Sequence, residues 1–198
     1  MIPRREDAMK MMGDYDRRRL LTAGGALGVG ALVAAGVSAP AQAESVPCAM
    51  NPSAPYHVGY VVPDIERAMH DLGRAVGVEW NPVRDGRLGD WSYRIVFSRS
   101  GPLYTELIEG PEGSPWDPGE GPRCDHVGFW AGGIDTCSRR LVEKGYPLDF
   151  DARPYGRPWA YHRMPGLGLR IELVDISIQP EFLQTWNPGG ATMPPLNC

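Results

Sequence analysis

The chain has 198 residues and a formal net charge of −4 at pH 7, from 20 Lys and Arg against 24 Asp and Glu. A mildly acidic chain of this kind excludes nucleic acid as an expected partner. Hydrophobic residues make up 42% of the chain, which is enough for one folded domain with a core of ordinary size.

Residues 1–43 have the features of an export signal rather than of a folded segment. Three arginines at 17–19 precede two leucines, as in a twin-arginine motif, and Ala41-Gln42-Ala43 ends an Ala/Gly-rich stretch with a small-residue cleavage site. Glycines within that stretch disfavour the alternative, an N-terminal membrane anchor. We expect cleavage before Glu44, no stable membrane span afterwards, and an exported protein that is periplasmic or secreted.

Cleavage would remove six basic and four acidic residues from the totals of 20 and 24, and so leave a net charge of −6. All four cysteines lie in the mature part, where an oxidising compartment permits disulfides. Three pairings of Cys48, Cys124, Cys137 and Cys198 are open. We expect a Cys48–Cys198 bridge, because both residues lie in Pro-rich terminal tails, and we expect Cys124 to be a small buried residue on the same strand face as His126.

The first half of the mature chain predicts a β-α-β-β-β unit after a tail at 44–54. An apolar, β-branched strand at 56–62 ends at Pro63-Asp64, and apolar residues at helical spacing then predict a helix over 64–76 that Gly77 closes. Three further strands are predicted near 78–83, 91–98 and 103–109.

The second half repeats this order. The predicted elements are a strand at 125–131, a helix at 134–144, and strands near 147–151, 159–163 and 169–175. A Pro/Gly-rich connector at 110–123 is long enough to place the second module beside the first or in another subunit, so a homodimer stays open. Residues 180–186 predict one helical turn within a Pro-rich tail at 177–198.

The repeat also carries a chemical pattern. His57-Val58-Gly59 recurs as His126-Val127-Gly128, and a strand with Glu106 recurs as one with Glu172. Duplicated units that pack around a pseudo-twofold axis bring equivalent positions together. His57, Glu106, His126 and Glu172 are therefore candidate ligands of one divalent metal ion, which two imidazoles and two carboxylates would leave formally neutral.

At these residues the chain resembles the vicinal oxygen chelate superfamily, which includes glyoxalase I, methylmalonyl-CoA epimerase, extradiol dioxygenases and bleomycin-resistance proteins. The resemblance covers residues 55–176. It implies an α+β fold in which two tandem β-α-β-β-β modules, at 55–110 and 124–176, form an open cup-shaped mixed sheet around a metal site. It also implies that Glu172 serves as the catalytic base, with Glu106 as its partner on the opposite face.

Three functions remain open from these residues and the resemblance. The first is an isomerase, epimerase or lyase that abstracts a proton next to a carbonyl with the help of Zn, Ni, Co, Mn or Fe. The second is an extradiol-type dioxygenase in which His57, His126 and Glu172 form a facial triad. The third is a metal-free module that binds a ligand or drug. The fourth candidate ligand favours the first function.

The expected substrate is a small molecule, apolar or aromatic and oxygenated. Thioesters of coenzyme A and glutathione are scarce outside the cytoplasm, and the arginines near 84–94 are scattered rather than clustered for a coenzyme phosphate. Aromatic residues and one histidine on the predicted strands are expected to line the cup. They are Trp91, Tyr93, Phe97, Trp130, Trp159, Tyr161 and His162.

Overall fold

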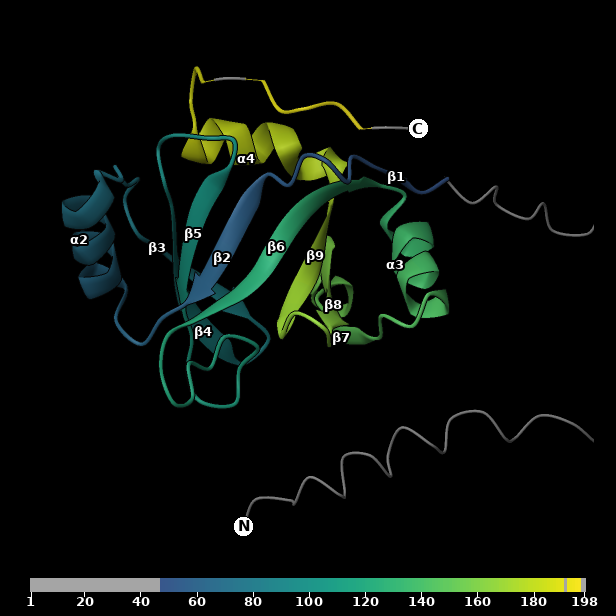
Figure 1. Ribbon diagram of the computed structural model, residues 1–198, viewed down its shortest axis with the longest axis horizontal. Coiled ribbons are helices and arrows are strands. Elements are labelled where there is room, and N and C mark those ends of the chain that lie inside the picture. Colours follow the sequence, from purple (N-terminus) through teal and green to yellow (C-terminus); the bar gives the residue numbers. More distant parts are fainter. Residues whose placement is uncertain (1–46, 191, 197–198) are drawn as a thin grey trace, which may run out of the picture. The chain divides into compact units, whose positions relative to one another are not determined.

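The computed structural model describes residues 47–190 and 192–196. The predicted export signal and Cys198 lie outside these residues. The described part contains a nine-stranded mixed sheet, flanked by helices on both sides (Figure 1). None of the helices in the described part is long and apolar enough to cross a membrane.

The first module follows the predicted order, with one change. Its elements are β2 (His57–Val61), α2 (Ile65–Val76), β3 (Arg84–Leu88), β4 (Trp91–Phe97) and β5 (Tyr104–Glu109). The side chain of Asp64 accepts a hydrogen bond from the backbone N–H of Arg67 and so caps α2, and Gly77 ends the helix in the left-handed conformation. The helix prediction is confirmed.

The prediction of a strand near 78–83 is wrong. Only Trp80 in that range pairs, as an isolated bridge with Ser98. Pro82 has no N–H to donate to a sheet, and the tight turn at Gly89 folds β3 back onto β4 as an edge hairpin. An edge strand tolerates polar side chains, so its hydrophobic pattern in the sequence is weak.

The second module confirms the repeat. Its elements are β6 (Arg123–Gly132), α3 (Ile134–Glu143), β7 (Leu148–Asp151), η1 (Arg153–Tyr155), β8 (Trp159–Met164) and β9 (Leu169–Asp175). η2 (Ile176–Ile178) and α4 (Gln179–Trp186) follow, so the predicted single turn is an eight-residue helix.

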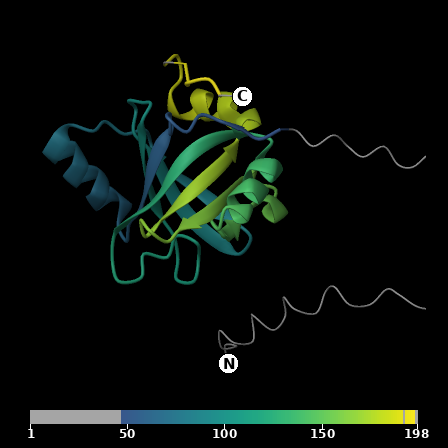
Figure 2. The same ribbon diagram turned by 45° about the vertical axis from the view of Figure 1, so that its right-hand side comes forward.

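The strands are ordered β3-β4-β5-β2-β6-β9-β8-β7, with the short β1 (Ala49–Met50) paired to β6. The first strands of the two modules, β2 and β6, pair antiparallel at the centre, and each pairs in parallel with the last strand of its own module. The sheet curls around its concave face, as the turned view shows (Figure 2). This confirms the predicted α+β fold, and the two modules join within one chain.

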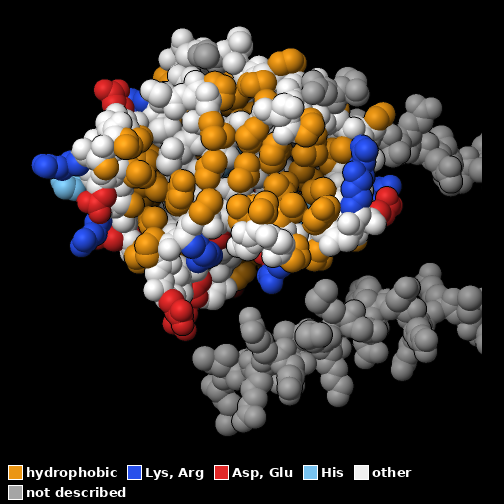
Figure 3. Space-filling view, in the orientation of Figure 1, with side chains coloured by type: hydrophobic (Ala, Val, Ile, Leu, Met, Phe, Trp, Pro, Cys, Tyr) orange, Lys and Arg blue, Asp and Glu red, His pale blue; other side chains and the backbone are white. Residues whose placement is uncertain are grey.

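Separate apolar clusters cover the outside of the sheet and fill the cup. Ile65 of α2 packs on Val96 and Leu107, whereas Ile134 of α3 packs on Ala131 and Leu173. Inside the cup, Phe182 and Trp186 of α4 pack against Tyr56, Phe97, Tyr104 and Trp130. On the face drawn in Figure 3, apolar side chains spread over the middle, while charged ones lie at the left, right and lower edges.

The predicted cysteine pairing is wrong. Cys48 forms a disulfide with Cys137 of α3, not with Cys198, because β1 runs along β6 and brings Cys48 beside that helix. Cys124 is a free, exposed cysteine rather than a buried one. A β-bulge between Cys124 and His126 removes the strict alternation that would place the two side chains on one face.

Candidate metal centre

The two histidines of the repeat face each other across the centre of the sheet. His57 on β2 lies opposite Gly128, and His126 on β6 lies opposite Gly59. Both side chains are fully buried, and their Nε2 atoms are 2.9 Å apart. The antiparallel pairing of the first strands therefore brings equivalent positions of the two modules together.

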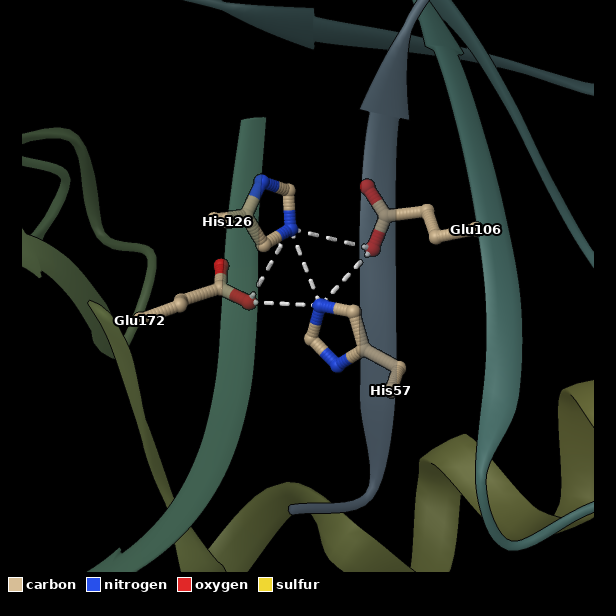
Figure 4. Close-up of side chains that lie close together, drawn as sticks. All are labelled: His57, Glu106, His126 and Glu172. Atoms are coloured by element: carbon tan, nitrogen blue, oxygen red, sulfur yellow. Dashed lines mark hydrogen bonds and ion pairs between the residues drawn. The ribbon is translucent and has the colours of Figure 1, made fainter. Parts of the chain in front are cut away.

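The two glutamates approach from the neighbouring strands (Figure 4). Oε2 of Glu106, on β5, lies 3.1 Å from Nε2 of His57 and 3.6 Å from Nε2 of His126. Oε2 of Glu172, on β9, lies 3.0 Å and 3.7 Å from the same two atoms. The four donor atoms all lie within 4.8 Å of one another, and all four residues are buried.

These distances fit the first coordination sphere of a divalent metal ion. Donor atoms about 2.1 Å from one ion lie about 3.0 Å apart at right angles and about 3.4 Å apart at tetrahedral angles. The observed spacings between the imidazoles and carboxylates run from 3.0 to 3.7 Å. The donor set suits zinc, nickel, cobalt, manganese or iron. The cluster could therefore hold one such ion.

The cluster also stabilises positive charge. Burial opposes the charged form of His126, but the carboxylates of Glu106 and Asp125 outweigh it and raise the pKa of His126 to about 10. Burial opposes charge on Glu106 as well, yet His126 and His57 lower the pKa of that carboxyl to about 2. Two carboxylates beside two buried imidazoles favour a cation at this place.

Sequence comparison identifies the family. A profile of the glyoxalase/bleomycin resistance protein/dioxygenase superfamily matches residues 56–161. The chain belongs to this superfamily. A search of curated proteins found no match.

Several solved structures are similar to this chain at low identity. Methylmalonyl-CoA epimerase from Mycobacterium tuberculosis is 19% identical, with a TM-score of 0.49 over 62% of this chain and 87% of that one. A single-residue variant of the Streptomyces coelicolor epimerase, in complex with 2-nitronate-propionyl-CoA, is 16% identical, with a TM-score of 0.47 over 62% and 96%. A triple mutant of 4-hydroxymandelate synthase from Streptomyces coelicolor is 16% identical, with a TM-score of 0.46 over 62% and 49%.

In this superfamily member the cup contains a cavity of about 160 Å³ next to the four candidate ligands. Glu106 and Glu172 form part of its wall, and aromatic and aliphatic side chains form most of the rest. Four of the residues predicted to line the cup do so, namely Tyr93, Phe97, Trp159 and Tyr161. The cavity is small in comparison with typical cofactor sites.

Of the other three predicted residues, Trp91 and Trp130 face the cup but lie outside this cavity, whereas His162 does not face the cup. Trp91 packs against Phe150 and Tyr155, and the ring of Trp130 is stacked on Tyr56, 4.1 Å between centroids, and covered by Phe182. His162 faces α3 instead of the cup: Nε2 lies 2.9 Å from Oγ of Ser138, and Nδ1 lies 3.1 Å from the carbonyl oxygen of Tyr146. Strand alternation places His162 opposite to Tyr161, which corrects the expectation that both line the cup.

Four aromatic or charged residues of the site were not predicted, and neither were the aliphatic lining residues Ile95, Ile108, Val174 and Ile178. Tyr56 and Trp116 line the cavity, and Asp125 and Arg170 lie behind His126. Tyr56 precedes the repeat histidine, so its position could have been noted from the sequence. The other three depend on a loop conformation, a bulge and a long side chain, none of which follows from periodicity.

Proposed function

We propose that this protein is a metal-dependent enzyme of the isomerase, epimerase or lyase type, which abstracts a proton next to a carbonyl group. One observation carries the proposal: a second buried glutamate, Glu106, converges on the cluster from the side opposite to Glu172. A facial triad needs only one carboxylate. A second one in the cavity wall supplies an additional group that can accept or return a proton.

The residues divide the chemistry between them. His57 and His126 would hold the ion, together with the carboxylates, and a bound divalent ion would stabilise negative charge that develops on a substrate carbonyl oxygen. The carboxylate of Glu172, in the cavity wall, accepts the proton from the adjacent carbon while the electron pair of the C–H bond moves toward that oxygen. Return of that proton from Glu172 to the neighbouring carbon isomerises the substrate. Glu106 approaches from the side opposite to Glu172, so a proton that it has first taken up from water can be delivered to that side of the carbon, which inverts it.

The cavity selects a small substrate. Among the described residues that line it there is no Lys or Arg, and its volume of about 160 Å³ suits a small molecule. Burial, together with the charges of Glu172 and Glu106, raises the pKa of the Tyr56 and Tyr161 hydroxyls well above the ordinary value. The hydroxyls therefore stay protonated and can donate hydrogen bonds. We propose a small apolar or aromatic compound with a carbonyl or hydroxyl oxygen as the substrate.

The aromatic lining also favours a second candidate, an extradiol-type dioxygenase that uses His57, His126 and Glu172. Elemental analysis of the protein purified from Glu44 onward, with oxygen consumption measured on a panel of catechols, separates the two. Near-stoichiometric Zn, Ni, Co or Mn without oxygen uptake, followed by deuterium exchange into a hydroxyketone, would support proton transfer. Iron with oxygen uptake would replace the proposal with ring cleavage. No metal after reconstitution would leave a ligand-binding module.

We also propose export, on the basis of the twin-arginine-type segment at 1–43. The twin-arginine route carries folded proteins, so a metal could be inserted before export. Fractionation of cells that produce the full chain, with an Arg17→Lys/Arg18→Lys variant as control, tests this. Retention of the wild-type chain in the cytoplasm would contradict it.

A further inference from the structure

The two candidate ligand histidines are held differently, although they occupy equivalent places in the repeat. Nδ1 of His126 lies 2.9 Å from Oδ2 of Asp125. Nδ1 of His57 is buried and has no hydrogen-bond partner among the described residues. Tyr56 occupies the position before His57 and stacks on an aromatic cluster instead. The two modules therefore differ at the residue that precedes each histidine: Asp125 contacts Nδ1 of its neighbour, and Tyr56 does not.

A β-bulge creates the contact in the second module. Gly59 pairs with His126 and Tyr60 pairs with Cys124, so Asp125 is the extra residue on β6. In a regular strand, Asp125 would point to the face opposite to His126. The bulge instead leaves both side chains buried together, with Asp125 only 4% exposed.

Arg170 extends this contact to the wall of the cavity. Nε of Arg170 lies 3.1 Å from Oδ2 of Asp125, and the guanidinium carbon lies 3.8 Å from the centre of the Tyr161 ring. The indole N–H of Trp116 donates to the hydroxyl of Tyr161 at 3.1 Å. One continuous set of contacts thus joins His126 to two aromatic side chains that line the cavity.

We infer that Asp125 is a positioning residue of the metal centre, which keeps a proton on Nδ1 of His126 and so directs the Nε2 lone pair into the cluster. Arg170 holds Asp125 in place and seats Tyr161 against the cavity. The inference rests on the proposed metal site. A carboxylate behind a ligand imidazole fixes its tautomer and raises its basicity, and losing such a partner typically costs about 10–100-fold in metal affinity.

The test compares Asp125→Asn with Asp149→Asn. Asparagine keeps the shape of Asp125 but lacks the charge that His126 and Arg170 share. Asp149 also contacts Arg170, at 3.5 Å from Nη1, and is the matched control. By competition with a chelator, we expect the Zn²⁺ dissociation constant to rise about 10–100-fold in Asp125→Asn and to stay near wild type in Asp149→Asn. Two results would contradict the positioning role and leave Asp125 as a structural partner of Arg170. One is an equal loss of Zn²⁺ affinity in both variants. The other is wild-type Zn²⁺ affinity in Asp125→Asn together with a lower melting temperature.

Two further measurements keep the test decisive. If the single variant does not fold, the neutral pair Asp125→Asn/Arg170→Gln replaces it, with the same expected loss of affinity. In the metal-free wild type, nitrogen-edited NMR should show a slowly exchanging Nδ1 proton on His126. This signal should be lost to rapid exchange with water in Asp125→Ala, which has no acceptor for it. Persistence of that proton would overturn the positioning role. If the wild type binds no metal, the proposed function fails, while this NMR signal still decides what Asp125 does.

Discussion

The ring of His57 lies over Gly128, where an added Cβ would stand only 1.9 Å from Cε1 of the imidazole. The relationship is reciprocal, because a Cβ at Gly59 would stand 2.1 Å from Cε1 of His126. The glycine of each module therefore makes room for the histidine of the other. This exchange across the pseudo-twofold axis explains why the unit that recurs is His-Val-Gly rather than histidine alone.

Alanine at either glycine should disturb the metal centre. We expect Gly59→Ala and Gly128→Ala to displace the opposing imidazole, to destabilise the domain by about 1–3 kcal/mol through overpacking, and to weaken metal binding. Urea unfolding and a Zn²⁺ titration measure the two effects. Gly166→Ala is the control, since nothing lies within 4 Å of a Cβ there, and it should stay within about 0.5 kcal/mol of wild type. Wild-type metal affinity in both strand variants would refute this packing account.

Removing either histidine should abolish tight metal retention. His57→Ala and His126→Ala each take away one of four donor atoms that lie within 4.8 Å of one another. We expect both variants to fold, as judged by circular dichroism, and to lose bound metal during dialysis. His70→Ala is the control, because the His70 side chain is 67% exposed. Full metal content in both cluster variants would rule out the proposed site.

The duplicated pattern predicted the candidate metal cluster, because a repeat specifies equivalent positions without requiring knowledge of the packing. His57 and His126 recur with their glycines, and Glu106 and Glu172 recur on the last strands of the modules. In the structure both glutamates lie in the cavity wall. What the repeat could predict was limited to features that both copies share.

The features that went unpredicted break either the repeat or the periodicity. Asp125 reaches His126 through a bulge, which is one extra residue that hydrophobic alternation does not register. β3 is a polar edge strand, so its sequence looks like a loop. The partner of Cys48 depends on where β1 lies, and a strand of two residues is too short to show hydrophobic alternation in the sequence. Trp116 reaches the cavity from a connector whose path follows from tertiary packing.

Replacing the proposed base should separate catalysis from metal binding. Glu172→Gln keeps an oxygen that can coordinate but cannot accept the substrate proton. We expect solvent deuterium exchange into a hydroxyketone identified by screening to fall by about 100-fold or more, with a smaller change in metal content. Glu109→Gln, on the other face of β5 from Glu106, is the control. Wild-type exchange by Glu172→Gln would remove that residue from the role of base.

The stability of the metal-free protein should depend on pH in a defined way. The pKa of His126 is about 10, above its ordinary 6.5, so its stabilising contribution is complete below about pH 6.5 and is lost as the pH rises through 10. The pKa of Glu106 is about 2, below its ordinary 4.5, so its contribution is lost as the pH falls through that range. We expect the free energy of unfolding in chelator to be greatest between about pH 4.5 and 6.5. A value that keeps rising to pH 9 would contradict the assignment.

The disulfide should stabilise the fold by tying the N-terminal strand to α3. Cys48 and Cys137 are 89 residues apart in the sequence, and Cys137 is almost fully buried against β6 and β9. Loss of a native disulfide in a domain of this kind typically costs about 2–5 kcal/mol, because the bridge limits the freedom of the unfolded chain. We expect Cys48→Ser to lower the free energy of unfolding by this amount, whereas Cys124→Ser, at an exposed free cysteine, should change it little. Equal stability of the two variants under oxidising conditions would show that the bridge contributes nothing to the fold.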